Sequence, residues 1–335
     1  MIEFSEATAV LIATAIKTER EQYEAEVKAK FDREVAEELH RKRVREAAAV
    51  KWAEEQALAT TPELIMGLLG ELDVNQDVPD LIDGVVKQGT TVFVGYSGSG
   101  KTRLALQVGY CLLSGTRFLD AMHRPGQHVQ QLGPEAKIGV LSYDMSLPLL
   151  ANWINAFPEH DAPNRWMIVD AFTRGQPLLV PVMRAQMAKT MREANVEFVI
   201  VDSATASFPG DSENDATQVL NHYLDLQRFA LNEVGAKGLL VIAHAGKASS
   251  TAIRGSSAAP GAVDSIMSVS FNEEDPLKIR RVASVKYREA IGQSAMAPGE
   301  LTAPEADSGL IRWAVEAQPI DIEGDEPGAE FGAVD

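Results

Sequence analysis

GYSGSGKT, residues 95–102, is the stretch of sequence from which the fold of this chain can be argued. It fits the pattern G-x-x-x-x-G-K-[ST], with the apolar run TVFVG before it and a helix-favouring run after it. Glycines in such a loop let backbone N–H groups surround phosphate groups, and the N-terminus of the following helix adds a favourable dipole. The segment therefore predicts a phosphate-binding loop between a strand and a helix.

The residues of this loop indicate a site for ATP and Mg²⁺. Lys101 is expected to reach the β- and γ-phosphates, and the hydroxyl of Thr102 is expected to bind Mg²⁺. The residues from which we expect nucleotide contacts are Gly95, Ser97, Gly98, Ser99, Gly100, Lys101, Thr102 and Arg103.

Two carboxylates at predicted strand ends would complete the site. The strand FVIVD ends in Asp202, where an acid beside the phosphate loop can contact Mg²⁺ through water. In VLSYDMS, Asp144 follows the strand after the phosphate-loop helix, where a carboxylate can orient or deprotonate the attacking water. Position alone leaves Asp144 equally well interpreted as the N-cap of a helix.

Outward from the loop, strand-like apolar runs alternate with helical patterns. The parallel strands expected are TVFVG, KIGVLSY, RWMIVD, EFVIVD and GLLVIAH, and a closing hairpin is expected from SIMSVSF and KIRRVASVKY. Such alternation predicts an α/β fold with a mainly parallel, twisted sheet that is covered by helices.

The two ends of the chain differ in composition from the middle. Residues 17–59 lack Pro and Gly and are rich in Ala, Glu, Lys and Arg, which predicts a charged helical extension over residues 1–59. Its apolar positions, spaced by four, form a narrow stripe of Val27, Phe31, Val35 and Leu39. Residues 60–80 are interpreted as a linker, residues 81–300 as the core, and residues 301–335 as a C-terminal segment with an acidic, disordered tail.

Composition limits the partners and the compartment. The formal net charge is −17, which argues against non-specific coating of nucleic acid, because phosphate binding needs clustered Lys and Arg. The single cysteine, Cys111, excludes an internal disulfide, so we expect a cytoplasmic location. The apolar stretch TAVLIATAI is too short to span a bilayer, so we expect no membrane partner.

The order of these pieces resembles the RecA/DnaB superfamily, and most closely the RepA-like hexameric ATPases of plasmid and phage replication, from about Pro79 to Gly292. VLSYDMS is similar to the strand that carries the family's catalytic glutamate, in whose place stands Asp144. LLVIAHAGK is similar to the segment that leads to a γ-phosphate-sensing Gln or His, a position taken by His244. The resemblance implies a RecA-like P-loop core that hydrolyses ATP, more slowly if the shorter carboxylate reaches less well.

KYREAIG is similar to the segment that carries the family's Lys-x-Arg pair, which reaches the nucleotide of the neighbouring subunit. The resemblance implies this role for Lys286 and Arg288, and with it a homo-oligomer, a hexamer in the family, whose ATP sites lie between subunits. An isolated subunit would then be a poor ATPase, because an arginine finger contributes about 10³ to 10⁵ in rate. The nearby Lys278, Arg280 and Arg281 are interpreted as solvated charges.

Single-stranded DNA is the ligand expected at two loops. The loop AGKASSTAIRGSSAA is small, rich in Gly and Ser, and carries Lys247 and Arg254, which suits the gripping of phosphates along a channel. The loop AFTRGQ offers Phe172 and Arg174. Ordinary surface loops are the alternative interpretation of both segments.

Three functions remain open. The leading hypothesis is a ring-forming, DNA-stimulated ATPase that acts as a helicase in replication or recombination, with partner proteins bound through the N-terminal helix or the acidic tail. The second is a RecA-like DNA-binding or loader protein that does not translocate. The third is a metal-dependent DNA exonuclease, suggested by the clustered acids Asp211, Glu213 and Asp215. Acids near a helix N-terminus are favourable in any case.

Overall fold

A computed structural model of the chain divides it into two compact units, Met1–Leu58 and Ala59–Asp335. The residues that it describes are 27–28, 30–33, 35–44, 51, 79–121, 124–158, 162–212, 214–246, 249–253, 259–271, 280–288, 293–305 and 308–314.

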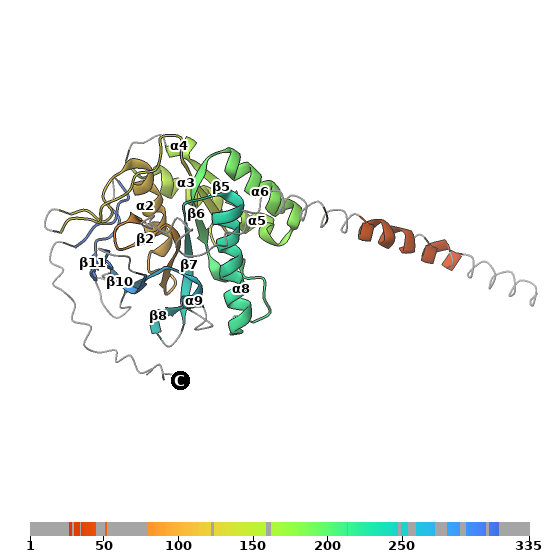
Figure 1. Ribbon diagram of the computed structural model, residues 1–335. Coiled ribbons are helices and arrows are strands. Elements are labelled where there is room, and N and C mark those ends of the chain that lie inside the picture. Colours follow the sequence, from red (N-terminus) through yellow and green to blue (C-terminus); the bar gives the residue numbers. More distant parts are fainter. Residues whose placement is uncertain are drawn as a thin grey trace, which may run out of the picture. The chain divides into compact units, whose positions relative to one another are not determined.

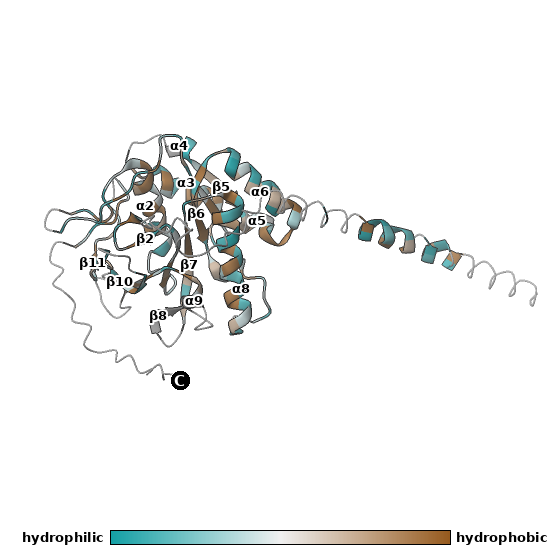
Figure 2. Cartoon of the chain, viewed as in Figure 1, coloured by the Kyte–Doolittle hydropathy of each residue, from teal (hydrophilic) through white to brown (hydrophobic). Residues whose placement is uncertain are grey.

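The described residues of the first unit are helical, as the composition predicts. The apolar stripe on this helix is exposed, with Phe31 63% accessible, and the ribbon around it is mostly coloured hydrophilic (Figure 2). The described residues of this unit do not cover the stripe, so burying it would require a partner from outside them.

A mainly parallel sheet forms the centre of the second unit (Figure 1). Its strands follow the spatial order β11 (Gly299–Leu301), β10 (Arg280–Tyr287), β9 (Ser265–Phe271), β3 (Gly89–Gly95), β7 (Gly238–Gly246), β6 (Val196–Asp202), β4 (Lys137–Ser142) and β5 (Trp166–Asp170). The pairs from β9 to β5 are parallel, whereas β10 and β11 add antiparallel strands at one edge. The short β8 (Ser249–Ile253) pairs with β7, and β1 (Asp80–Ile82) pairs with β2 (Val86–Lys87).

Helices connect these strands and cover both faces of the sheet (Figure 1). They are α2 (Lys101–Ser114), α3 (Leu147–Asn155), α4 (Ala162–Arg165), α5 (Ala171–Arg174), α6 (Pro181–Glu193), α7 (Ala204–Ser207), α8 (Ala216–Gln227) and α9 (Ala259–Ala262), with a 3₁₀ turn at Pro177–Leu179 and a π-helical turn at Arg228–Val234. Helix α2 follows the phosphate loop, and α8 with its π-helical continuation packs beside α6.

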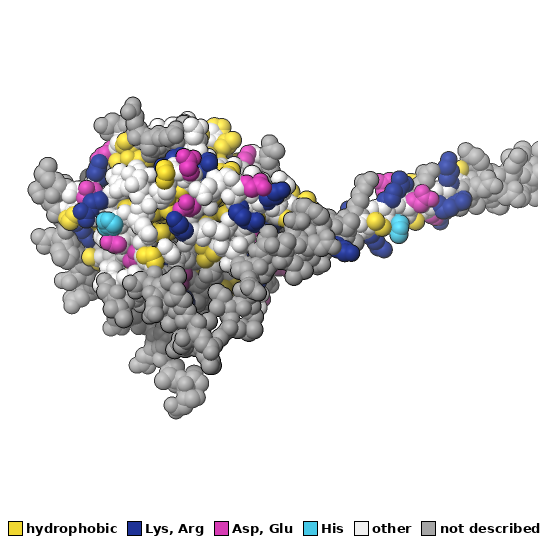
Figure 3. All heavy atoms as spheres, turned by 45° about the horizontal axis from the view of Figure 1, so that its top comes forward, with side chains coloured by type: hydrophobic (Ala, Val, Ile, Leu, Met, Phe, Trp, Pro, Cys, Tyr) yellow, Lys and Arg dark blue, Asp and Glu magenta, His cyan; other side chains and the backbone are white. Residues whose placement is uncertain are grey.

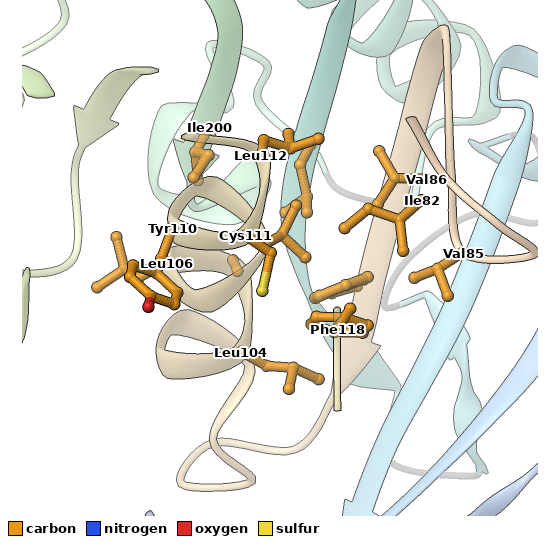
Figure 4. Packing of buried hydrophobic residues seen from close by; sticks show 14 of the residues in the cluster. Ile82, Val85, Val86, Leu104, Leu106, Tyr110, Cys111, Leu112, Phe118 and Ile200 are labelled. Atoms are coloured by element: carbon orange, nitrogen blue, oxygen red, sulfur yellow. The ribbon is translucent and has the colours of Figure 1, made fainter. Parts of the chain in front are cut away.

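Two apolar clusters hold these layers together. On one face, residues of α2 and of the β1–β2 hairpin belong to one cluster, and Figure 4 shows Cys111 and Leu112 on the helix with Ile82 and Val86 across the cluster from them. The other cluster joins the opposite face of the sheet to α6 and α8. Because the central strands are covered on both faces, they read as continuous apolar runs in the sequence (Figure 2).

The α/β fold with a mainly parallel sheet is therefore confirmed, and the strand-like runs quoted above all form strands of this sheet. One boundary differs from expectation. The packed core continues past residue 300, because Leu301, Leu310 and Ile311 are buried and Trp313 is fully inaccessible. Short, separated apolar residues after a Pro-bearing stretch carry little periodicity, so their sequence does not indicate that they belong to the core.

No helix among the described residues is both long enough and apolar enough to cross a membrane.

Candidate nucleotide-binding site

The predicted phosphate loop joins the end of β3 to the start of α2. Gly98 and Gly100 have φ angles of 78° and 94°, a left-handed conformation that glycine adopts without the steric cost of a Cβ. Among the described side chains, none caps the N-terminus of α2. The first N–H groups of this helix therefore lie at the place where an anion is most favourably bound.

Lys101 folds back over this loop and is only 5% exposed. Its Nζ donates to the carbonyl oxygens of Gly95 and Tyr96, at 2.8 and 2.6 Å. Burial lowers the pKa of Lys101 to about 8, against the opposing effect of the carboxylates Asp202 and Asp144. A desolvated ammonium held among carbonyl dipoles is well placed to bind phosphate, because its charge is weakly compensated by solvent.

Asp202 lies at the end of β6 and faces the start of α2. Its Oδ2 accepts a hydrogen bond of 2.9 Å from the hydroxyl of Thr102. These hard oxygen ligands fit Mg²⁺, which binds through one or two protein groups and takes its remaining ligands from phosphate and water. A cluster of three or more His, Cys, Asp or Glu residues able to hold a metal is absent from the described part of the chain. The pair thus suits an ion that arrives with the nucleotide.

Burial raises the pKa of Asp202 to about 6. Removal of water from around the carboxylate is the largest cause, and the nearby charge of Asp144 adds to it, whereas the hydrogen bond from Thr102 opposes it. At neutral pH the nucleotide-free protein therefore holds a carboxylate that would be more stable in water, and a bound cation would relieve this cost.

We expect Asp202→Asn to stabilise the nucleotide-free protein at pH 7.5 by about 3 kcal/mol, since the pKa of Asp202 is raised from 3.8 to about 6 and each pKa unit corresponds to about 1.4 kcal/mol. The folded pKa lies above the ordinary value of 3.8, so the cost of the charged form is absent below about pH 3.8, grows as the pH rises from there toward the folded value, and is fully present above about pH 6. Urea denaturation of both proteins at pH 4.5 and pH 7.5, with a chelator present, measures this difference. A variant that is less stable than the wild type at both pH values would contradict the prediction.

Three polar side chains meet at the ends of neighbouring strands β4, β6 and β7. Asp144 Oδ2 accepts a 2.5 Å hydrogen bond from the hydroxyl of Ser203 and lies 3.5 Å from His244 Nε2. The hydrogen bond from His244 is the main cause that lowers the pKa of Asp144 below its ordinary value, and Ser203 contributes as well. Asp144 is therefore ionised at neutral pH and can accept a proton. Ser146 occupies the N-cap position of helix α3, so Asp144 is not its N-cap.

One cavity of about 740 Å³ brings most of these residues together. It is lined by loop residues Ser97, Gly98 and Gly100, and by Lys101, Thr102, Arg103, Asp144, Asp202 and His244. Strand register explains the meeting of residues far apart in sequence, because Ser142 pairs with Asp202 and Gly95 pairs with His244. The cavity has the size usual for a small-molecule site.

The cavity also contains residues that the sequence analysis missed. They are Met145, Trp153, Ala156, Ile242, Arg280, Pro304, Glu305, Gly309 and Ile311. Arg103 links two of these regions, since its guanidinium donates to the carbonyls of Gly309 and Trp153. No motif marks the segment around Gly309, so only its packing in the fold reveals this contribution.

The interpretation of Arg280 as a solvated charge is wrong. Its Nε donates to the carbonyl of Ser99 at 3.2 Å, and its side chain lines the cavity. Its neighbour Arg281 lies outside the cavity and pairs with Glu300 in a partly exposed ion pair. Alternation along β10 places adjacent side chains on opposite faces, and a hairpin sequence alone does not say which face meets the loop.

The other predicted site residues lie away from this cavity or outside the described residues. Lys286 donates to the carbonyl of Val263, and Arg288 pairs with Asp264 and donates to Gly261, so neither lines the cavity of its own chain. Arg174 is the last residue of α5. Lys247 and Arg254 fall outside the described residues.

Two of the acidic residues that suggested a nuclease make contacts at and near the N-terminus of α8. Asp215 is the N-cap of α8 and accepts hydrogen bonds from the backbone N–H groups of Thr217 and Gln218. The backbone N–H of Asp211 donates to the side chain of Gln218, and Glu213 lies outside the described residues. The capping role is the one that elementary helix chemistry predicts for an acid at this position.

Comparison with known families agrees with this geometry. A family model described as an AAA domain matches residues 54–250, which include the phosphate loop, Asp144, Asp202 and His244. Strands β9, β10 and β11 follow the matched residues. No curated protein matches the chain.

Proposed function

Because the chain belongs to the AAA-domain family of P-loop ATPases, we propose that it is a ring-forming, DNA-stimulated ATPase of the RepA/DnaB type that acts as a helicase. The observation that best supports ATP hydrolysis is that Lys101, Asp144 and Asp202 line the same cavity. Lys101 is poised for the phosphates, Asp202 and Thr102 for Mg²⁺, and the ionised Asp144 for the attacking water.

Assembly into an oligomer is supported by two features. Arg288 is 55% exposed and lies outside the cavity of its own chain, as a residue that serves a neighbouring site would. The stripe of Val27, Phe31, Val35 and Leu39 is exposed, and burial of such apolar surface against another subunit or a replication partner would be favourable.

Contact with single-stranded DNA is proposed at the loops that carry Lys247, Arg254 and Arg174. On the face shown in Figure 3, Lys and Arg side chains are interspersed with Asp and Glu, so that face offers no single-sign basic surface. With a net charge of −17, a local, positively charged loop is the form of DNA contact that electrostatics allows.

We expect single-stranded DNA to raise ATP turnover at least about tenfold, which corresponds to about 1.4 kcal/mol of the activation free energy. Steady-state turnover at fixed protein concentration, with and without single-stranded DNA, measures this. Lys101→Ala serves as the blank, because it removes the phosphate-binding ammonium. Lys247→Ala with Arg254→Ala tests the loop, and Lys189→Ala, on the exposed face of α6, is the matched control for loss of a surface cation.

A DNA-binding or loader protein that does not translocate is the second candidate. Asp144 favours it, because its carboxylate is already engaged by Ser203 and His244 and is shorter than a glutamate. Nucleotide-dependent DNA binding without strand separation would support this candidate. DNA-stimulated turnover that also separates a forked duplex would support the helicase, and turnover that is equal with and without DNA would overturn the DNA-driven motor.

A further inference from the structure

Arg280 occupies a position that the proposed chemistry does not use. It begins β10, opposite Phe271 at the end of β9, and β9 pairs in parallel with β3. Antiparallel pairing therefore brings the start of β10 to the edge of the sheet where β3 ends and the phosphate loop begins. The topology of the sheet thus places the positively charged side chain of Arg280 beside the phosphate loop, although the two are far apart in the sequence.

The contacts of Arg280 place it directly on the loop. Its Nε donates to Ser99 O, and a Cβ built on Gly100 would lie 3.0 Å from the same nitrogen. A side chain at position 100 would thus be in tight contact with the guanidinium, which would have to shift slightly. Gly100 serves both the left-handed backbone and the close approach of this cation.

The charge of Arg280 is not neutralised by a carboxylate within the described part of the chain. Ser99 O is its one hydrogen-bond partner there, although a guanidinium carries five N–H donors. The other nearby arginines differ, since Arg281 pairs with Glu300 and the guanidinium of Arg103 is used by two backbone carbonyls. A guanidinium that lines a cavity and has N–H groups available for further hydrogen bonds is suited to bind an anionic ligand.

We propose that Arg280 binds the polyphosphate chain of the nucleotide held by its own subunit, as a second cation beside Lys101. This inference rests on the proposed ATP-binding function and adds to it a residue outside the matched family region. It differs from the role proposed for Lys286 and Arg288, which would act on a neighbouring subunit. Arg280 acts within one chain, so its contribution does not depend on assembly.

Affinity for nucleotide tests this proposal without reference to turnover. The dissociation constants of MgADP, MgATPγS and adenosine are measured by calorimetry for the wild type, Arg280→Gln, Arg280→Lys and Arg281→Gln. Arg280→Gln is expected to weaken MgADP and MgATPγS about tenfold or more, because a hydrogen bond between charged groups is lost, and to leave adenosine unchanged. Arg280→Lys keeps the charge without the planar fork and is expected to be intermediate.

Arg281→Gln is the matched control, since it removes the same charge from the adjacent position outside the cavity, and it is expected to bind all ligands within twofold of the wild type. An Arg280→Gln protein that binds MgADP and MgATPγS as tightly as the wild type would overturn the proposal and leave ATP binding intact. Equal weakening of adenosine would also overturn it, because adenosine carries no phosphate and its weaker binding would indicate a general distortion of the cavity rather than the loss of a phosphate contact. If Arg280→Gln fails to fold, Arg280→Lys is used instead. The proposal would be overturned if Arg280→Lys binds MgADP and MgATPγS as tightly as the wild type and if the salt dependence of these dissociation constants is unchanged. A wild type that binds no nucleotide would overturn the proposed function itself.

Discussion

Arg288→Ala is expected to lower ATP turnover by about 10³-fold or more, because an arginine finger that stabilises transition-state charge contributes about 10³ to 10⁵ in rate. Its guanidinium is now held by Asp264 at 2.9 Å and by the carbonyl of Gly261. The side chain of Arg288 is 55% exposed, and an ion pair at the surface contributes only about 0–1 kcal/mol; its partner Asp264 is 19% exposed and keeps a hydrogen bond from the N–H of Thr90 when Arg288 leaves. Release of Arg288 toward a neighbouring nucleotide would therefore cost little. Nucleotide affinity of the isolated subunit should remain unchanged.

A mixing experiment separates action on a neighbour from action within the chain. Arg288→Ala and Lys101→Ala should each be nearly inactive alone. When they are mixed, some interfaces join an intact phosphate loop to an intact Arg288, and turnover should return in part. Arg281→Ala, which breaks a comparable ion pair elsewhere, is the control for a general loss of charge. Turnover of Arg288→Ala within twofold of the wild type, or no recovery on mixing, would contradict the finger.

Asp144→Asn is expected to lower turnover at least about 10²-fold, since general base catalysis contributes about 10² to 10⁴. The amide keeps an oxygen that can accept the hydrogen bond from Ser203 but cannot accept a proton from water. Binding of MgATPγS should be little changed, because Lys101 and Asp202 remain in place. Single-turnover kinetics measure the chemical step directly.

Ser203→Ala is the matched control for this change. It removes the closest donor to Asp144 and leaves the carboxylate, so the pKa of Asp144 should rise toward its ordinary value. The group would still be ionised at pH 7.5, and turnover there should fall by less than about tenfold, the scale of one lost hydrogen bond of this kind. The acidic limb of the pH–rate profile should move to higher pH. Full activity of Asp144→Asn would exclude the carboxylate as the base.

The sequence determined the elements that depend on neighbouring residues. The loop from Gly95 to Thr102 can be recognised because its glycine spacing, lysine and flanking strand and helix are all local in the chain. The strands were equally readable, since burial on both faces demands continuous apolar runs such as FVIVD. Asp202 and Asp144 were predicted from strand ends, where parallel strands deliver their functional side chains.

Tertiary structure alone decided which distant residues join these elements. The partners of Asp144, namely Ser203 and His244, follow from the register of three strands rather than from any spacing in the chain. The different roles of Arg280 and Arg281 follow only from the folded sheet, because one face of β10 is turned toward the phosphate loop and the other is not. Trp313 belongs to the core because the chain returns to pair with Leu301 after the last recognisable strand. In each case the deciding contact joins residues that are far apart in the sequence. Local propensity does not predict which of several charged or isolated apolar residues will make such a contact in the completed sheet.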